Sequence, residues 1–401
     1  MAEWITTTLE ECTDILGDGL HGTPKYTENG EYAFVNGNNL VDGEILIKKE
    51  TKRVDYSQYD KYKKPLTNRT ILVSINGTLG NVGVYGSEKI ILGKSACYFN
   101  VKESVDKDFI YYIVSSPTFK QYLESNATGT TIKNISLKQM REYTFELPEI
   151  GEQKRISSVL RKIDEKIKNN RAINNNLKQQ YISIVDNLLS KLTQYKIYSL
   201  LEVADCQNGR AFYKEGYDPN GAFVIDLGNV NTSGNFVRTA ADKYISLDRY
   251  KEPKLEKYRV YKNDIVMVMT DRKSTMELLG KVGKIYKDGY YLLNQRMYRI
   301  RAKKGINTNY LYACLNSTET SNFLKRKALG SVQKYVNTGE INSIEIKVPS
   351  SEKMEEIASI LDPIFSQMES NILENESLNE LRDILLPKLM SGEIDVSDID
   401  L

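Results

Sequence analysis

The sequence predicts an α+β protein with two mixed α/β domains of related sequence, separated by two long helices that form an antiparallel coiled coil. Three observations support this prediction. Short motifs recur at a nearly constant offset, each copy of the repeat contains short apolar runs typical of strands, and each copy ends in a long heptad pattern. At about 150 residues per domain, a chain of 401 residues accommodates two or three domains.

The internal repeat sets the domain organisation. The recurring pieces are Leu-Gly-x-Val-Gly at 79–83 and 279–283, Gly-Thr or Gly-Ser at 129–130 and 330–331, and an aliphatic residue with proline at 147–148 and 348–349. Their offset of 200 or 201 residues indicates two equivalent halves, and Ala-Phe-Val also recurs at 33–35 and 222–224. We therefore expect a first mixed domain at 1–148, a first long helix at 149–195, a second mixed domain at 196–349, and a second long helix with a tail at 350–401.

Both mixed domains contain short strands and short helices. Thr70–Ile75 and Asp264–Met269 are apolar or β-branched runs flanked by Asn, Asp and Gly, which is typical of buried strands. Residues 108–115 and 309–316 have the pattern of short helices. Asn76-Gly77 and Asp288-Gly289 predict turns.

A long helix follows each mixed domain. From 156 to 188 and from 357 to 389, mostly apolar residues recur at alternating steps of four and three, the heptad pattern of a coiled coil. The residues expected to pair are Ile156, Leu160, Ile163, Asn170, Asn174 and Leu177 in the first helix, and Ile357, Leu361, Ile364, Asn371, Asn375 and Leu378 in the second. Equivalent domains at opposite ends of a pseudo-two-fold axis require antiparallel helices. The alternative is two amphipathic helices that each dock on their own domain.

The net charge of +2 hides a strong segregation of charge. Residues 196–349 contain 26 lysines and arginines against 16 acidic residues, so this region is a plausible binder of a polyanion. Residues 149–195 carry 9 basic and 5 acidic residues, whereas 350–401 carry 3 and 13. The two helical regions can therefore attract each other.

Several functional classes are excluded. A single histidine, His21, rules out catalysis by a histidine pair, and the four cysteines are too dispersed for a zinc site or a disulfide framework. The first residues lack the pattern of a signal peptide and no run is long enough to span a bilayer, so we expect a cytoplasmic protein. Gly17–Gly22 matches a dinucleotide-binding motif, but Thr23-Pro24 follows where a helix should begin, which predicts a turn-rich loop. We expect neither a catalytic constellation nor a metal site.

The remaining pattern suits nucleic acid. Arg299, Arg301 and Lys303 alternate and would share one face of a strand, and Arg, Asn and Gln can read base edges, with Arg210 and Arg296 as candidate guanine readers. The candidate DNA contacts are Thr23, Lys25, Tyr26, Lys94, Thr130, Thr131 and Lys133 in the first domain, and Arg210, Asn294, Gln295, Arg296, Arg299, Lys325, Arg326, Lys327, Ser331 and Lys334 in the second. A solvated basic face is the alternative for each residue.

Three motifs resemble those of a known family. Pro148–Ile156 is similar to a Pro-x-x-x-Glu-Gln-x-x-Ile helix entry, Leu385–Ile394 resembles a Leu-Leu-x-x-Leu-x-Ser-Gly-Glu-Ile ending, and Gly19–Pro24 looks like a Gly-x-His/Thr-x-Pro loop. The second helix entry departs from the pattern, with Lys353 after Glu352 where glutamine is expected. Together with the alternation of domains and helices, these motifs resemble the specificity subunit of type I restriction–modification enzymes.

The resemblance implies a role and a set of partners. Each mixed domain would be a target-recognition domain that reads one half of a split double-stranded DNA target, and the helices would set the distance between the halves. The chain itself would be non-catalytic and free of cofactors. It would dock two methyltransferase (modification) subunits, which bind S-adenosylmethionine, and restriction/translocase subunits, which use ATP and Mg²⁺. A stand-alone coiled-coil DNA-binding or scaffold protein, and an enzyme with an unrecognised site, remain alternatives.

Overall fold

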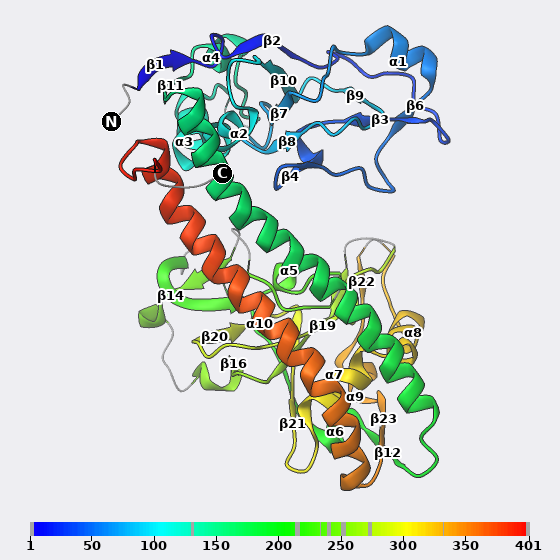
Figure 1. Ribbon diagram of the computed structural model, residues 1–401. Coiled ribbons are helices and arrows are strands. Elements are labelled where there is room, and N and C mark those ends of the chain that lie inside the picture. The colour runs from blue at the N-terminus through cyan, green and yellow to red at the C-terminus, as the bar shows by residue number, and fades with distance from the viewer. Residues whose placement is uncertain are drawn as a thin grey trace. The chain divides into compact units, whose positions relative to one another are not determined.

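A computed structural model describes residues 4–129, 132–212, 217–232, 234–238, 242–249, 254–271, 275–331 and 333–397 (Figure 1). The chain forms two compact units. The first contains residues 1–168 and 376–401, and the second contains residues 169–375. The unit boundaries fall inside the two long helices, so each unit contains one mixed domain and a segment of both helices.

The first unit is built around a four-stranded antiparallel sheet. Its order is β2 (Thr13–Asp18), β10 (Ala96–Val101), β7 (Thr70–Ser74) and β8 (Val82–Val84) (Figure 1). Three smaller sheets accompany it: β6 (Arg53–Val54), β3 (Tyr32–Val35) and β9 (Ile90–Leu92); β1 (Ile5–Thr8) with β11 (Thr144–Leu147); and β4 (Leu40–Val41) with β5 (Glu44–Ile45). The helices are η1 (Gly37–Asn39), α1 (Tyr56–Tyr62), α2 (Lys107–Ser115), α3 (Pro117–Asn126) and α4 (Leu137–Arg141). The predicted strand at 70–75 and helix at 108–115 are confirmed.

The second unit repeats this topology. Its antiparallel sheet has the order β13 (Ala204–Asn208), β21 (Met297–Ala302), β17 (Ile265–Val268) and β19 (Val282–Lys284). The smaller sheets are β15 (Lys243–Ile245), β14 (Tyr217–Ile225), β20 (Tyr291–Leu293) and β16 (Arg259–Val260); β12 (Lys196–Ser199) with β23 (Glu345–Val348); and β18 (Thr270–Asp271) with β22 (Lys334–Tyr335). The helices are α6 (Leu200–Val203), η3 (Leu227–Asn229), η4 (Leu247–Arg249), η6 (Glu256–Tyr258), α7 (Thr308–Asn316), α8 (Thr318–Arg326) and α9 (Thr338–Asn342). The predicted strand at 264–269 and helix at 309–316 are confirmed.

Strand pairing shifts the match between Ala-Phe-Val at 33–35 and 222–224 by a single residue. The parallel ladders pair Ala33 with Ile90 in the first domain and Phe223 with Tyr291 in the second. Because Ile90 and Tyr291 are 201 residues apart, the counterpart of Ala33 is Phe223 and not Ala222. A three-residue match cannot fix a strand register, whereas the ladder does, since a slip by one residue reverses the faces of a strand.

The long helices begin close to where the prolines predict. Helix α5 covers Ile150–Ser190 and α10 covers Ser351–Met390. At the entry to α5, the buried Gln153 side chain donates from Nε2 to the carbonyl of Pro148 at 2.7 Å and accepts from the amide of Asp106 at 2.8 Å. Asp106 is the N-cap of α2, so one glutamine ties the long helix to its domain.

The second entry uses a different side chain in the same place. The amide of Asn307, the N-cap of α7, donates to the sulfur of the buried Met354 at 3.3 Å. Met354 and Asn307 lie 201 residues after Gln153 and Asp106. The structural counterpart of Gln153 is therefore Met354, and the residue expected to replace it, Lys353, instead pairs with Glu356 at 2.7 Å.

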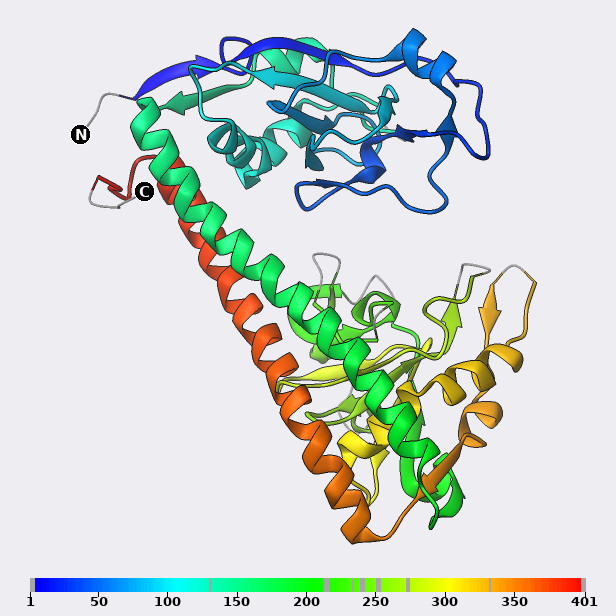
Figure 2. The ribbon, with the colours of Figure 1, turned by 45° about the vertical axis from the view of Figure 1, so that its right-hand side comes forward.

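The two helices are antiparallel in each unit, as predicted (Figure 2). In the first unit Arg382 of α10 forms an ion pair with Asp164 of α5 at 3.1 Å. In the second unit Asn170 donates to Asn375 at 3.0 Å, and Asn371 donates to Asn174 at 2.8 Å. The residue numbers in each pair sum to 545 or 546, which is the signature of a single antiparallel register.

The burial pattern departs from a strict heptad. Leu177 is half-buried whereas Lys178 is buried, and Ile364 is half-buried whereas Phe365 is buried. An undistorted α-helix turns once in 3.6 residues, so a heptad pattern drifts by about 20° in every seven residues. Of the other residues expected to pair, Asn375 and Leu378 are half-buried, and the buried ones are Ile156, Leu160, Ile163, Asn170, Asn174, Ile357, Leu361 and Asn371.

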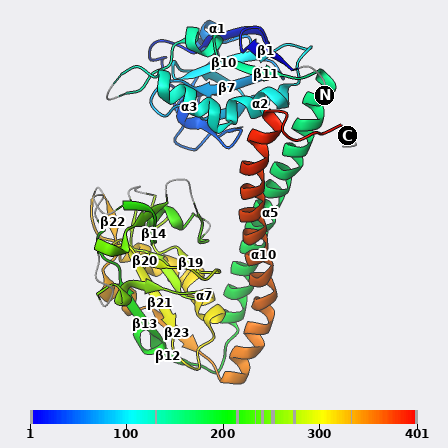
Figure 3. The same cartoon turned by 90° about the vertical axis from the view of Figure 1, so that its left-hand side faces the viewer.

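The helices also dock on the domains. Ile156 and Leu160 belong to the core of the first domain, and Ile357 and Leu361 to that of the second. In the second unit, α7 lies against both long helices, and Tyr312 of α7 is 5.2 Å from the ring of Phe365 (Figure 3). Helix pairing and docking on the domains, which the sequence presents as alternatives, therefore occur together.

Docking buries one lysine of α5. The side chain of Lys178 is 3% exposed, with its ammonium 5.0 Å and 4.8 Å from the ring centroids of Tyr181 and Tyr312 and 3.4 Å from the Tyr312 hydroxyl. No carboxylate among the described residues pairs with it. Burial, together with the nearby positive charge of Lys281, holds the pKa of Lys178 well below its ordinary value.

Replacing this lysine should change how stability depends on pH. In the unfolded chain a lysine stays protonated up to a pH of about 10.4, whereas the pKa of Lys178 in the folded chain is lower. Between the two values unfolding takes up a proton, so the free energy of unfolding should rise with pH in that window. Lys178→Met should remove this rise and stabilise the chain at pH 7 by about 1–3 kcal/mol.

Urea denaturation followed by circular dichroism at pH 7 and pH 9.5 measures this effect. The exposed Lys162 of α5 gives the matched control Lys162→Met, which should behave like the unmodified chain at both values of pH. A Lys178→Met variant that is less stable at pH 7, or that keeps the full rise, would contradict the assignment.

Candidate nucleic-acid interface

Main-chain hydrogen bonds join three segments of the first domain that carry candidate DNA contacts. The loop after β2 meets the turn after β9, where the Lys94 amide donates to Leu20 at 3.1 Å. The Ile75 amide, at the end of β7, donates to the carbonyl of Ser95 at 3.0 Å. The Ile135 amide, next to the hairpin 128–134, donates in turn to Ile75 at 2.9 Å. Loop, turn and hairpin therefore form one connected edge.

The second domain contains the same connections. The Arg210 amide donates to Leu293 at 3.0 Å, the Met269 amide donates to Arg296 at 3.0 Å, and the Val336 amide donates to Met269 at 3.0 Å. We call this set of loop, turn and hairpin the reading edge of each domain. It comprises residues 20–26, 93–95 and 128–134 in the first domain, and residues 210–212, 294–296 and 329–335 in the second.

The described parts of the two hairpins share a bridge and a glycine conformation. Thr128 bridges to Asn134 and Leu329 to Tyr335, at an offset of 201 residues. Gly129 and Gly330 have φ of 91° and 90°, and an added Cβ would lie 2.3 Å from the carbonyl oxygen of Ile132 or 2.1 Å from that of Gln333. Only glycine fits there. Lys133, Ser331 and Lys334 lie on these hairpins, and Thr130 and Thr131 fall outside the described residues.

The loop after β2 is not a dinucleotide site. Leu20 forms a bridge with Gly93 rather than opening a helix, as the sequence predicts. A Cβ on Gly19 would lie 2.3 Å from the carbonyl of Leu92, and one on the equivalent Gly209 would lie 1.8 Å from that of Asn294. Glycine is therefore needed here for close contact between two main chains.

Exposed side chains populate the first reading edge. Thr23, Lys25, Tyr26 and Lys94 are all exposed, as is Lys133. The Lys25 amide donates to the Gln58 side chain of α1 at 3.0 Å, so the loop is fixed to that helix.

Sequence reasoning missed the surface around α1. Tyr59 of α1 stacks on Tyr32 at 4.0 Å, and Tyr56, which is 62% exposed, lies 6.1 Å from Tyr59. Residues 48–64 contain seven lysines and arginines against three acidic residues, a local signal that the acidic balance of the whole domain concealed. This basic, aromatic surface adjoins the reading edge through Gln58.

The predicted basic row on β21 is used inside the fold. Arg301 pairs with the buried Asp264 at 2.7 Å, and Arg299 donates to the carbonyl of Arg259 at 2.7 Å. Burial lowers the pKa of Arg299. Lys303 donates to the carbonyl of Leu201 at 2.6 Å. Arg299 and Arg301 therefore both make guanidinium hydrogen bonds within the domain, and the assignment of Arg299 as a DNA contact stays a prediction.

Arg210 is also held by the fold. Its guanidinium lies 5.6 Å from the ring of Phe212 and 5.7 Å from that of Tyr258, which is the geometry of a cation–π contact.

The basic cluster 325–327 ends α8, immediately before the hairpin of the second reading edge. All three side chains are exposed. Lys327 pairs with Glu340 at 3.1 Å, and the positive charge of Lys325 contributes, after burial, to a lowered pKa of Lys281. The first domain has Glu124, Ser125 and Asn126 at the equivalent positions, so the cluster distinguishes the two reading edges.

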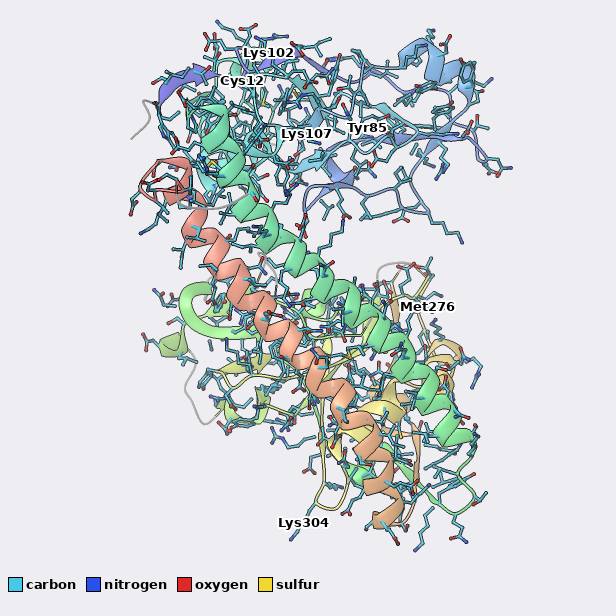
Figure 4. The ribbon with its side chains drawn as sticks, in the orientation of Figure 1. Cys12, Tyr85, Lys102, Lys107, Met276 and Lys304 are labelled. Carbon is cyan, nitrogen blue, oxygen red and sulfur yellow. The ribbon has the colours of Figure 1, made fainter. Side chains whose placement is uncertain are left out.

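The turn of the second reading edge borders a hollow of about 530 Å³. Asn294, Gln295 and Arg296, three of the predicted base readers, line it together with Thr270 and Asp271 of β18. Glu277 and Leu278, which directly follow Met276 in the chain (Figure 4), also line the hollow.

Nothing in the described part of the chain resembles a catalytic or metal centre. The described residues contain no group of three or more His, Cys, Asp or Glu that could hold a metal ion. Burial raises the pKa of Cys206 to about 11 and that of Cys314 to about 12, which keeps both thiols protonated. Among the described helices, none is both long and apolar enough to cross a membrane.

Comparison with known proteins identifies the family. The sequence profile described as "Type I restriction modification DNA specificity domain" matches residues 1–179 and, a second time, residues 193–382. The chain belongs to this family. The two matches coincide with the two halves of the internal repeat, so each half is one DNA specificity domain.

Individual relatives agree with this assignment. The chain is 22% identical to a "Type I restriction enzyme MjaIX specificity subunit" of Methanocaldococcus jannaschii, over 94% of this chain and 87% of the relative. It is also 22% identical to a "Type I restriction enzyme EcoBI specificity subunit" of Escherichia coli, over 89% and 81%. The crystal structure of an S subunit from M. genitalium superposes with a TM-score of 0.54 at 19% identity, covering 97% of this chain and 96% of that one.

Family membership establishes the function of the chain. This chain is a non-catalytic specificity subunit whose function is recognition of a DNA target, and its two mixed domains are target-recognition domains. The resemblance noted in the sequence is confirmed.

Substitution of the hairpin glycines tests whether each domain recognises its own segment of the DNA. Gly330→Ala should weaken recognition by the second domain, because alanine at this φ costs about 1–3 kcal/mol and distorts the hairpin. Gly129→Ala should do the same to the first domain. Binding assays on DNA altered in one recognised segment at a time measure both effects.

Gly339→Ala is the matched control, since an added Cβ there has no neighbour within 4 Å. The two test variants should affect different segments of the DNA, and an equal loss on every DNA would contradict separate reading edges.

Proposed function

We propose that this chain recognises a split double-stranded DNA target, with each reading edge contacting one half. The observation that supports this most directly is the pair of equivalent main-chain ladders, which present different side chains from the same backbone. Lys94 on the first edge corresponds to Gln295 on the second, and Ser95 corresponds to Arg296. Side chains of different hydrogen-bonding capacity favour different base pairs, so the two halves of the target should differ.

We also propose the partners that the family resemblance implies. Two methyltransferase (modification) subunits would dock on the chain, and restriction/translocase subunits would complete the complex. S-adenosylmethionine, ATP and Mg²⁺ would all be bound by these partners. The complex would act on DNA in the cytoplasm.

Methylome sequencing of cells with and without the gene tests the proposal. The expected result is a split methylated motif that disappears with the gene. Two results together would favour a stand-alone DNA-binding scaffold. The purified chain would bind DNA without a methyltransferase partner, and methylation in cells would not depend on the gene.

The helix pair should act as a ruler. Removing residues 169–175 together with 370–376 takes seven residues from each helix, about 10.5 Å at 1.5 Å per residue. Seven residues are close to two helical turns, so the flanking residues keep their faces, and the ion pair of Asp164 with Arg382 remains to hold the antiparallel register. The gap between the half-sites should shorten by about 3 base pairs, at about 3.4 Å each, with unchanged half-site bases.

The methylated motif of the deletion variant gives this gap directly. Ile173→Ala is the control, because this side chain is 44% exposed and the substitution keeps the helix length. An unchanged gap, or altered half-site bases, would contradict the proposal that helix length sets the distance between the half-sites.

Lys325 and Arg326 should contact DNA phosphates. The double variant Lys325→Gln with Arg326→Gln should weaken binding to all sequences alike and flatten the slope of log affinity against log salt by about 0.9 for each lost contact. Lys327→Gln should have a smaller effect, because Lys327 is already paired with Glu340. Salt titrations of DNA binding distinguish these outcomes, and an unaltered slope in the double variant would remove the cluster from the DNA surface.

A further inference from the structure

The hollow of the second domain has a closed counterpart in the first. By strand register, Asn36 and Ser95 correspond to Asp226 and Arg296. In the first domain the Ser95 hydroxyl accepts from the Gly37 amide at 2.9 Å and donates to the Asn36 side chain at 3.0 Å. These contacts join the turn to η1 and leave Ser95 engaged within the protein.

Among its described residues, the second domain lacks the equivalent contact between its turn and η3. Asp226 accepts from the Gly228 amide at 2.9 Å and pairs with Lys243, so its carboxylate is occupied on the side of η3. The Arg296 side chain lines the hollow and makes no hydrogen bond or ion pair to the described residues. A short serine held by the fold has therefore been replaced by a long cation that faces an open space.

The wall of the hollow favours a base over a phosphate. Among the described residues, the carboxylates of Asp226, Asp271 and Glu277 line it against the cations of Lys243 and Arg296. Carboxylates repel a phosphate, although the domain as a whole carries ten more basic than acidic residues. The Thr270 hydroxyl also lines the hollow and is buried without a hydrogen-bond partner among the described residues. A buried polar group without a partner costs free energy that a polar ligand atom would recover.

The hydrogen-bonding groups of the base pairs indicate which ligand suits these side chains. Arginine donates two parallel hydrogen bonds to O6 and N7 of guanine, and carboxylates accept from the amino group of cytosine. A G·C pair presents both features in the major groove. Arg210, the other candidate guanine reader in this domain, already stacks on Phe212 and Tyr258.

We propose that Arg296 reads the guanine of a G·C pair in the second half-site. The inference rests on the proposed function of reading a split DNA target. It assigns base readout to Arg296, whereas the neighbouring cluster at 325–327 binds the backbone.

Two substitutions at Arg296 test the assignment in the full chain co-expressed with its methyltransferase partner. Arg296→Ser recreates the first-domain residue, and Arg296→Lys keeps the charge but loses the planar pair of donors. Both should lower affinity for the cognate DNA by roughly 5- to 150-fold and make one guanine position tolerant of other bases. With Arg296→Lys the salt slope should stay unchanged, because no charge is lost.

Lys304→Ser, at an exposed lysine of the second domain outside its reading edge, is the control and should leave both affinity and motif unaltered. Thermal denaturation checks that each variant is folded, and Arg296→Lys remains informative if Arg296→Ser is not. The inference is overturned by a second half-site without guanine, by an unchanged motif in both variants, or by a uniform loss on all sequences with a flatter salt slope. Absence of any sequence-specific methylation by the unmodified chain would instead refute the proposed function.

Discussion

The antiparallel register of α5 and α10 is the constraint on which the rest of the molecule depends. Asn170 with Asn375, and Asn174 with Asn371, are related by the 201-residue repeat, so one pair is the image of the other. Buried asparagines satisfy each other in one register and are left unpaired by a slip, which makes a slip costly. In the second unit these pairs hold the segments of α5 and α10 antiparallel.

Equivalent positions in this framework carry different chemistry. The ion pair of Asp164 and Arg382 in the first unit corresponds, 201 residues on, to Phe365 and Tyr181 in the second, whose rings are 4.8 Å apart. The helix entries likewise use an amide in Gln153 and a thioether in Met354 for the same backbone contact. The repeat preserves geometry, whereas the interactions that maintain it differ in each half.

This difference explains what could be predicted from the sequence. The repeat, the strands at 70–75 and 264–269 and the antiparallel helices follow from periodicity and offset, which do not require knowledge of contacts. The burial of Lys178 and the internal pairing of Arg301 with Asp264 depend on which element packs opposite. The sequence singled out no role for Lys178, and it presented Arg301 as part of a basic row suited to nucleic acid. The surface around α1 was missed because the net charge of the whole domain does not reveal a local cluster of basic residues.

The ladders that build the reading edges consist of main-chain hydrogen bonds, together with glycines that permit close approach. Their stability therefore depends little on which side chains project from them. Serine can be exchanged for arginine at the position of Ser95 and Arg296 without disturbing the bond that the carbonyl of that residue accepts. In evolutionary terms, the main-chain bonds that build these edges are separate from the side chains that we propose contact DNA. Point substitutions of these side chains can therefore change the DNA target while the fold is kept.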